Sequence, residues 1–266
     1  MFGDLTRIHQ VAVPEIPDRE IVHAPHPPLT GYYGRAEDRP GWVRRMFDGT
    51  AADYDRIERL MGFGLGSRYR RDALNRAGLQ QDMQILDVGV GTGLVARQAA
   101  AIVGNPACVT GLDPSPGMLR NANVPAGVRL VEGSAENIPY PDASFDFVSM
   151  GYALRHITDL SEALCEFFRV LKPGGRLCIL EITRPEKRFH AALLKCYLRG
   201  VVPWLAKLAA RQADTPQLWS YYWDTIDACV PPGRVLHTFE SAGFSNVHRH
   251  LELGIFSEYR AQKPVC

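Results

Sequence analysis

The feature that most constrains the fold is a short apolar run followed by closely spaced glycines. The run and the turn read Ile85-Leu86-Asp87-Val88-Gly89-Val90-Gly91-Thr92-Gly93. Apolar residues of this kind are typical of a buried strand, and the glycines let the backbone turn tightly and approach a ligand. Thr92 is placed to cap the helix that follows. Free N–H groups at a helix start suit a carboxylate or a phosphate, so the glycines alone do not choose between these ligands.

The glycine spacing and two acidic residues distinguish a ligand with a carboxylate, such as S-adenosylmethionine, from a dinucleotide with a pyrophosphate. A dinucleotide fingerprint is spaced G-x-G-x-x-G, whereas the spacing here is G-x-G-x-G. Asp87, two residues before the first glycine, would attract the ammonium of a methionine moiety and repel a pyrophosphate. Asp113 closes a second apolar run, where a carboxylate can accept both ribose hydroxyls. The pattern predicts S-adenosylmethionine rather than NAD; the alternative is an ordinary strand-to-helix turn with an unrelated surface aspartate.

The composition favours one catalytic domain that works on small molecules. The chain has 266 residues, 46% of them hydrophobic, which is ample for the core of one large α/β domain. A formal net charge of +1 gives a nucleic-acid partner no electrostatic support. The six cysteines lack C-x-x-C spacing, so we expect no zinc or other metal and reduced, mostly buried thiols. Without a signal-like start or a membrane-length apolar stretch, the chain is expected to be cytoplasmic.

The chain divides into a proline-rich arm, residues 1–40, and a domain, residues 41–266. Six prolines in the arm prevent a long helix or strand, so we expect an extended segment. Its His23-x-x-His26 pair has no third ligand nearby, and we expect both histidines to be solvated. Residues 42–77 have helical spacing, with one apolar face formed by Phe47, Tyr54, Ile57, Leu60 and Met61.

Predicted strands and helices alternate through the rest of the domain. The strands are expected at residues 84–88, 107–112, 128–132, 145–150 and 176–182, with helices after the first two and over residues 161–170. This alternation indicates a parallel sheet with helices on both faces, a Rossmann-like α/β fold. A sharp turn is expected at residues 172–175 and an aromatic-rich helical insertion at 185–232. A helix at 236–242 and a hairpin of the runs 245–251 and 254–262 follow.

These motifs resemble class I S-adenosylmethionine-dependent methyltransferases, and more closely the ubiquinone/menaquinone biosynthesis C-methyltransferase family. The similarity runs from about Phe47 to the C-terminus, and its markers are the glycine motif and the segments 47–55, 135–142, 153–159 and 171–177. The segment Leu-Arg-x-x-Thr-Asp, residues 154–159, is the discriminating one because it is characteristic of the quinone-modifying branch. The resemblance implies a seven-stranded, mostly parallel sheet with an antiparallel C-terminal hairpin.

Carried over by position, the resemblance also implies the cofactor contacts. Asp87, Gly89 and Gly93 would surround the methionine moiety, with Gly91 in the same turn. Asp113 would hold the ribose and Met118 would pack near the adenine. Ser134 and Ala135 look like the adenine-edge contact. Relatives usually carry Asp or Asn at the Ser134 position, and a hydroxyl accepts the adenine amino group more weakly than a carboxylate.

For catalysis the resemblance points to Arg155, acting with a water, and to Tyr54 as a pocket hydroxyl. Ring-carbon methylation needs an electron-rich ring, which an ionised neighbouring phenol supplies. Because arginine holds its proton tightly, we expect Arg155 to stabilise the phenolate while water takes the proton. His156 stands where the family usually has asparagine; it is either the base or a structural residue bonded to a nearby helix or strand end. Glu58 also differs from the residues that the family usually carries in this stretch, and this difference leaves the identity of the substrate undecided.

The insertion is expected to roof the pocket as a substrate lid. Tyr221 matches a family tyrosine and is the predicted substrate contact. The aromatic residues of this segment could line a pocket for a ring or a polyprenyl tail, or could simply be helix core: Trp204, Trp219, Tyr221, Tyr222 and Trp223. Its basic residues could bring the pocket mouth to a membrane surface or form a solvated face: Lys187, Arg188, Lys195, Arg199 and Lys207.

The sequence thus predicts an S-adenosylmethionine-dependent methyltransferase acting on a ring carbon of a quinol or a related lipophilic, hydroxylated aromatic. One alternative keeps the cofactor and moves the methyl group to oxygen or nitrogen of another natural product. A second is a cofactor-binding scaffold without turnover, and a third is a nicotinamide oxidoreductase. The oligomeric state stays open, a homodimer included.

Overall fold

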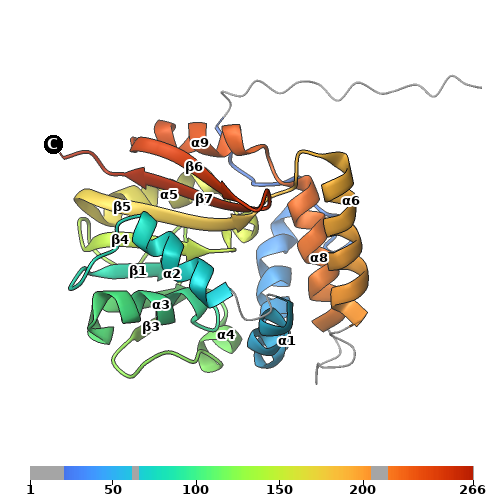
Figure 1. Ribbon diagram of the computed structural model, residues 1–266, viewed down its shortest axis with the longest axis horizontal. Helices are drawn as coiled ribbons and strands as arrows, with labels where there is room; N and C mark the ends of the chain where they lie inside the picture. The colour runs from blue at the N-terminus through green and yellow to red at the C-terminus, as the bar shows by residue number, and fades with distance from the viewer. Residues whose placement is uncertain (1–20, 62–65, 205–214, 266) are drawn as a thin grey trace, which may run out of the picture.

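Seven strands of the described residues form a single mixed sheet in the order β3-β2-β1-β4-β5-β7-β6 (Figure 1). The computed structural model describes residues 21–61, 66–204 and 215–265. The strands are β1 Ile85–Val88, β2 Val109–Asp113, β3 Arg129–Glu132, β4 Phe145–Gly151, β5 Leu171–Ile182, β6 Ser245–Glu252 and β7 Phe256–Gln262. The first five pair in parallel, whereas β7 is antiparallel to β5 and to β6. The predicted seven-stranded, mostly parallel sheet with a C-terminal hairpin is confirmed.

Helices cover both faces of the sheet and its carboxyl edge. They are α1 Arg39–Met61, α2 Gly66–Arg76, α3 Leu94–Val103, α4 Pro116–Arg120, α5 Leu160–Val170, α6 Arg188–Cys196, α8 Thr215–Ala228 and α9 Pro232–Ser241. Short helical turns are η1 Ala36–Asp38, η2 Pro106–Cys108, η3 Leu154–His156 and the π-helical η4 Tyr197–Val201. One core joins α2 and α3 to the sheet, and a second joins α5 and α9 to the opposite face. Figure 1 shows α1, α8 and α6 grouped beyond the strand ends.

The central strands are covered on both faces, which is why their sequences are apolar without alternation. All four residues of β1 and all five of β2 are buried. A parallel strand enclosed by helices buries both sets of side chains, so the polar residues Asp87 and Asp113 stand out at or near the strand ends. The sheet therefore fixes where these two carboxylates lie.

Two predicted boundaries were wrong. The residues expected to form a sharp turn, 172–175, belong to β5, which begins at Leu171. Leu171 pairs with Phe145 and a bulge before the Phe147–Arg176 pair absorbs the extra residues, while Gly174 adopts a positive φ of 79°. Helix α9 begins at Pro232, four residues before the expected start, because proline is well suited to the first turn of a helix.

Residues 21–38 lie against the domain as a strap. The carbonyls of His23 and Pro25 accept hydrogen bonds from the backbone of Leu160 and Val230, and Val22 donates to the Thr238 hydroxyl. The prediction that both histidines are solvated was wrong for His26, which is 2% exposed and bonds its Nδ1 to the Pro27 carbonyl. Burial lowers the pKa of His26 to about 4. His23 is exposed and pairs with Asp159.

The expectation of mostly buried thiols was wrong. Cys108 and Cys178 are buried, Cys229 is half-buried, and Cys165 and Cys196 are exposed; all five are free. Cys266 lies outside the described residues, as do Lys207 and the side chains of Ile57, Leu60 and Met61. Among the helices in the described ranges, none has the length and apolarity needed to cross a bilayer.

Candidate active site

A cavity of about 390 Å³ opens at the carboxyl ends of β1, β2 and β4. Its wall comes from the glycine loop, the start of α4, the loop after β3, the β4–α5 connection, α1, α2 and α8. The carboxyl edge of a parallel sheet is where such folds bind ligands, because the loops there diverge. The cavity therefore lies where the sequence pattern placed it.

The glycine loop needs its glycines for steric reasons. Gly89 has φ 68°, and a Cβ there would lie 2.7 Å from the Ala153 Cβ. Gly93 has φ 89°, and its Cβ would lie 2.3 Å from Val124 Cγ1. Gly93 itself, rather than Thr92, occupies the N-cap of α3. The expected Thr92 cap was thus wrong: this hydroxyl donates to Asp55 of α1.

Asp113 reaches the cavity wall with its orientation fixed. One carboxylate oxygen accepts the Gly91 amide at 2.8 Å and the other the Ser115 amide at 2.8 Å. Burial raises its pKa to about 6. Each oxygen keeps further acceptor capacity, which is the chemistry a vicinal diol requires. The other predicted contacts on this side also line the cavity, namely Gly89, Gly91, Met118, Ser134 and Ala135.

Asp87 lies beneath the glycine loop rather than on the cavity wall. It is 1% exposed, and one oxygen accepts the Ser149 hydroxyl at 2.7 Å. The other oxygen has no hydrogen-bond partner among the described residues. Burial raises the pKa of Asp87 to about 7. The structure therefore places this carboxylate under the loop, and its contact with the methionine moiety stays a prediction.

Arg70 is a wall residue that the sequence analysis missed. Its guanidinium is almost fully buried, bonds the Glu58 carboxylate at 2.6 Å and lies 5.3 Å from the centre of the Tyr152 ring. Its Nε has no described partner. Glu58, noted as a departure, is thus the ion-pair partner of Arg70. The available signal was the helical spacing of Arg70 with the buried Ala73, Leu74 and Ala77, which places one arginine of α2 on the apolar face.

Aromatic side chains form the far end of the cavity. Tyr54 and Tyr222 line it, and their hydroxyls lie 2.6 Å apart. Phe47 also lines it and meets the His156 ring edge-on at 5.2 Å. Burial raises the pKa of Tyr54 well above its usual value. This end offers a ring-shaped apolar space with a few polar atoms.

His156 lines the same end with both ring nitrogens free of partners among the described residues. The alternative in which it bonds a helix or strand end was therefore wrong. Burial, followed by the charges of Arg155 and Arg39 and by His26, holds the pKa of His156 well below its usual value. At neutral pH the imidazole is uncharged and carries one acceptor and one donor.

Arg155 and Tyr221 lie behind the wall. Arg155 is fully buried, pairs with Glu181 at 2.8 Å and lies 5.1 Å from the Tyr222 ring. Tyr221 packs against Trp42 and His156, while its neighbour Tyr222 supplies the wall. Among the insertion aromatics in the described ranges, only Tyr222 lines the cavity. The structure thus places Arg155 and Tyr221, a predicted catalytic residue and the predicted substrate contact, outside the space that a substrate would fill.

Helix α1 is fastened across the end of the cavity that the glycine loop forms. The Asp48 carboxylate accepts the Ser115 hydroxyl and the Gly117 amide, both at 2.7 Å. Asp55 accepts from Thr92 and pairs with Arg97 at 3.0 Å. These contacts join α1 to both loops that follow β1 and β2.

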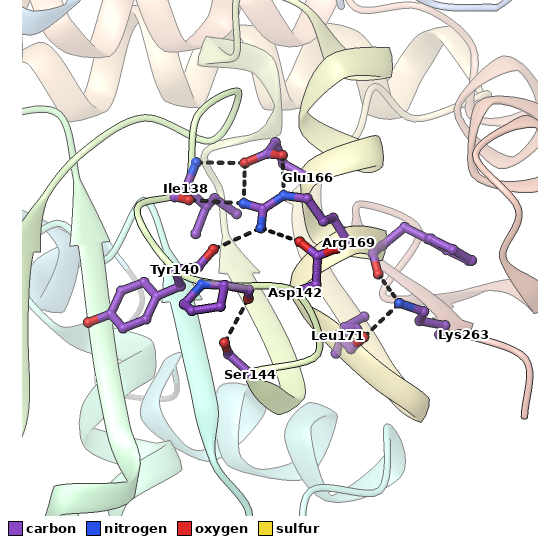
Figure 2. Close-up of polar contacts among 10 residues, drawn as sticks. Ile138, Tyr140, Asp142, Ser144, Glu166, Arg169, Leu171 and Lys263 are labelled. Carbon is purple, nitrogen blue, oxygen red and sulfur yellow. Dashed lines mark hydrogen bonds and ion pairs between the residues drawn. The ribbon is translucent and has the colours of Figure 1, made fainter.

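Arg169 of α5 anchors the loop that carries Ser134 and Ala135. Figure 2 shows its guanidinium bonded to the carbonyls of Ile138 and Tyr140 and paired with Asp142 and Glu166. Glu166 in turn accepts the Ile138 amide at 2.8 Å. One arginine thus ties the backbone after β3 to the helix beneath it.

Comparison with known proteins gives the family. The model of the ubiE/COQ5 methyltransferase family matches residues 34–263. The chain belongs to the ubiE/COQ5 methyltransferase family. A demethylmenaquinone methyltransferase of Tropheryma whipplei is 35% identical, over 82% of this chain and 90% of its own. The ubiquinone/menaquinone biosynthesis C-methyltransferase UbiE of Syntrophotalea carbinolica is 37% identical, over 83% and 94%. A solved SAM-dependent methyltransferase from Thermotoga maritima shares the fold, with 21% identity, coverage of 83% and 99%, and a TM-score of 0.58.

The cofactor of this ubiE/COQ5 methyltransferase is S-adenosylmethionine, and the residues present fit it. Asp113 would accept the ribose hydroxyls, and Met118, Ser134 and Ala135 would border the adenine. Arg70 would meet the carboxylate of the methionine tail, since its guanidinium is the buried cation on the wall beside the glycine loop. Gly89 lines the space between these groups, whereas Gly93, which the resemblance also assigns to the methionine moiety, does not line the cavity.

Proposed function

We propose that the chain transfers a methyl group from S-adenosylmethionine to a ring carbon of a quinol or a related lipophilic, hydroxylated aromatic. The relatives named above act, by their names, on demethylmenaquinone or in ubiquinone and menaquinone biosynthesis. The observation that carries the proposal is the aromatic end of the cavity, where an uncharged His156 without a described partner faces the same space as Tyr54 and Tyr222. A cytoplasmic location stays a prediction that cell fractionation would test.

The chain has to orient the ring and raise its electron density. S-adenosylmethionine supplies a methyl group on a positively charged sulfur, which needs no further activation. A ring hydroxyl that donates a hydrogen bond to His156 gains phenolate character, so its ortho and para carbons become stronger nucleophiles. The ring carbon gains the methyl group and loses its proton to water. Arg155, buried behind Tyr222 and paired with Glu181, orients its dipole toward this end from behind the wall and would act on the developing negative oxygen only indirectly.

The test is product analysis with the full-length chain, methyl-labelled S-adenosylmethionine and a short-chain demethylmenaquinol. We expect the label on a ring carbon by NMR. Tyr222→Phe and His156→Ala should each lower kcat about tenfold to a hundredfold, because each removes a polar group from the substrate space. Tyr221→Phe is the matched control and should leave kcat within about twofold, since this ring lies off the wall.

Label on oxygen would overturn the proposal in favour of the O-methyltransferase alternative. Cofactor binding without turnover of any phenol would instead support a scaffold. Calorimetry with S-adenosylhomocysteine separates these outcomes from a general loss of folding, because all three variants should bind it like the wild type.

A further inference from the structure

Four large apolar side chains are exposed on the helical segment that starts with α6. Phe189 is 76% exposed, Leu193 62%, Val201 42% and Trp204 61%. They make up half of the eight large apolar residues exposed in the described part of the chain. Single exposed apolar residues are normal on any protein, but a row of four within one segment marks a contact surface. We call these four residues the α6 stripe.

The α6 stripe is not part of the core of the insertion. Ala191, Leu198 and Val202 of the same segment are buried. Leu198 and Val202 pack in one cluster with Leu218 and Trp219 of α8. The segment therefore satisfies its packing against α8 with its inner face. Figure 1 shows α6 at the edge of the molecule, outside α8 and away from the sheet.

Exposed cations surround the stripe. Lys187, Arg188, Lys195 and Arg199 are all exposed. Arg199 pairs loosely with Asp224 at 3.7 Å, and the other three make no ion pair with a described residue. Glu186 is the only acid between residues 184 and 204, although the whole chain has a net charge of only +1. Positive charge is thus concentrated around the apolar row.

We propose that this face docks on the surface of an anionic lipid bilayer, with the α6 stripe at the level of the headgroups and upper acyl chains. Apolar side chains flanked by lysine and arginine are the arrangement that binds such an interface. A second copy of the chain fits less well, because a two-fold contact would set the same cations against one another. The inference rests on the proposed function for its purpose: α8 lies between α6 and the cavity, so docking brings the site of a lipophilic acceptor near the bilayer.

The test is sedimentation of the full-length chain with vesicles of phosphatidylcholine, with and without about one third phosphatidylglycerol. We expect binding to the anionic vesicles, and weakening of at least about fivefold when salt rises from about 0.05 to 0.5 M. The pair Phe189→Ser and Leu193→Ser should weaken binding about tenfold or more, as should the triple change of Lys187, Arg188 and Lys195 to glutamate. Leu253→Ser is the matched control, since Leu253 is 80% exposed on the turn between β6 and β7.

Absence of wild-type binding to anionic vesicles would overturn the proposal. So would binding that neither salt nor the two multiple variants weaken, or a dimer in light scattering that the Phe189→Ser, Leu193→Ser pair dissolves. Turnover of the short-chain acceptor in solution is measured in parallel. If turnover fails while charge-dependent docking persists, the proposed function falls and the docking surface stands. If docking fails while turnover persists, the docking surface is overturned and the proposed function stands.

Discussion

At the scale of single residues, His156 defines what the cavity can do. Its neighbours leave it without a described hydrogen-bond partner: the rings of Phe47, Tyr221 and Tyr222 surround it. Burial disfavours the protonated form of the imidazole, and so does the positive charge of Arg155, Arg39 and, when it is protonated, His26. A neutral imidazole in this position can accept a hydrogen bond from a phenol, but it is a weak base. It therefore serves better to polarise a hydroxyl than to remove its proton outright.

This assignment predicts the pH dependence of the reaction. The pKa of His156 is lowered, so the active neutral form persists as pH falls through about 6.5, where an ordinary histidine becomes charged. The profile of kcat/KM against pH for the wild type should therefore have the same shape between about pH 5.5 and 7.5 as that of His156→Asn, at a higher level. Any change of kcat/KM with pH that comes from the titration of Asp113 or Asp87 should appear in the profiles of both the wild type and the variant. A wild-type limb near pH 6.5 that the variant lacks would contradict the assignment.

The sequence predicted the residues that line the cavity near the glycine loop better than those at its aromatic end. The expected wall residues Asp113 and Met118 follow directly from strand ends and helix starts, which local patterns reveal. Tyr222 instead of Tyr221 reaches the wall because the rotation of α8 depends on its packing against α1, which no local pattern encodes. Arg70 was missed for the same reason: its role depends on burial in a tertiary contact.

At the scale of elements, the loop after β3 depends on α5. The loop has no regular structure of its own beyond one bridge between Ser134 and Asn137. Arg169 holds the loop instead, because its guanidinium donates hydrogen bonds to the backbone carbonyls of Tyr140, at 2.8 Å, and Ile138, at 3.0 Å. Ser134 and Ala135, the predicted adenine-edge residues, are therefore positioned by a helix that does not itself line the cavity.

Arg169→Ala should loosen this loop. We expect the free energy of unfolding to fall by about 1–3 kcal/mol, because charged hydrogen bonds to the backbone are lost, and the affinity for S-adenosylhomocysteine to fall several-fold. Urea unfolding and calorimetry measure the two effects. Arg68→Ala is the control, since Arg68 is exposed and its ion pair with Asp72 is a loose contact of 3.8 Å. Equal losses for both variants would show that the loop does not need its anchor.

The order of elements was predictable because strand and helix periods differ, and because β1 and β2 are mostly apolar, without the alternation of a half-exposed strand. The strap was not. Its prolines indicated correctly that no long helix or strand forms in residues 21–35, but His26 was expected in solvent. The residues beside it make long-range backbone contacts with Leu160 of α5 and with Val230, two residues before α9, and these contacts leave no periodic trace in the sequence.

At the scale of the whole molecule, the final hairpin ties the early helix α2 to the sheet. Glu258 of β7 is fully buried and pairs with Arg76 of α2 at 3.0 Å and with Arg260 at 3.1 Å. Arg76 also reaches Glu252 of β6 at 3.2 Å. Because α2 carries Arg70, a contact near the end of the chain helps to hold the cavity wall.

Removing one side of this contact should be costly. Arg76→Met leaves the buried Glu258 with Arg260 alone, and we expect a loss of about 2–4 kcal/mol in urea unfolding. The double variant Arg76→Met, Glu258→Gln should be destabilised by at least about 1 kcal/mol less than the sum of the single variants, since the buried carboxylate that loses Arg76 is no longer charged. Strict additivity would mean that the ion pair does not couple α2 to β7.

The fastening of α1 bears on ligand exchange. Asp48 and Asp55 hold this helix to the loops after β2 and β1, and residues of α1 also form part of the cavity wall. A nucleoside bound in that space would lie beside a helix that is held at two points. We expect these two contacts to slow the exchange of spent for fresh cofactor, because the opening of such elements often limits turnover.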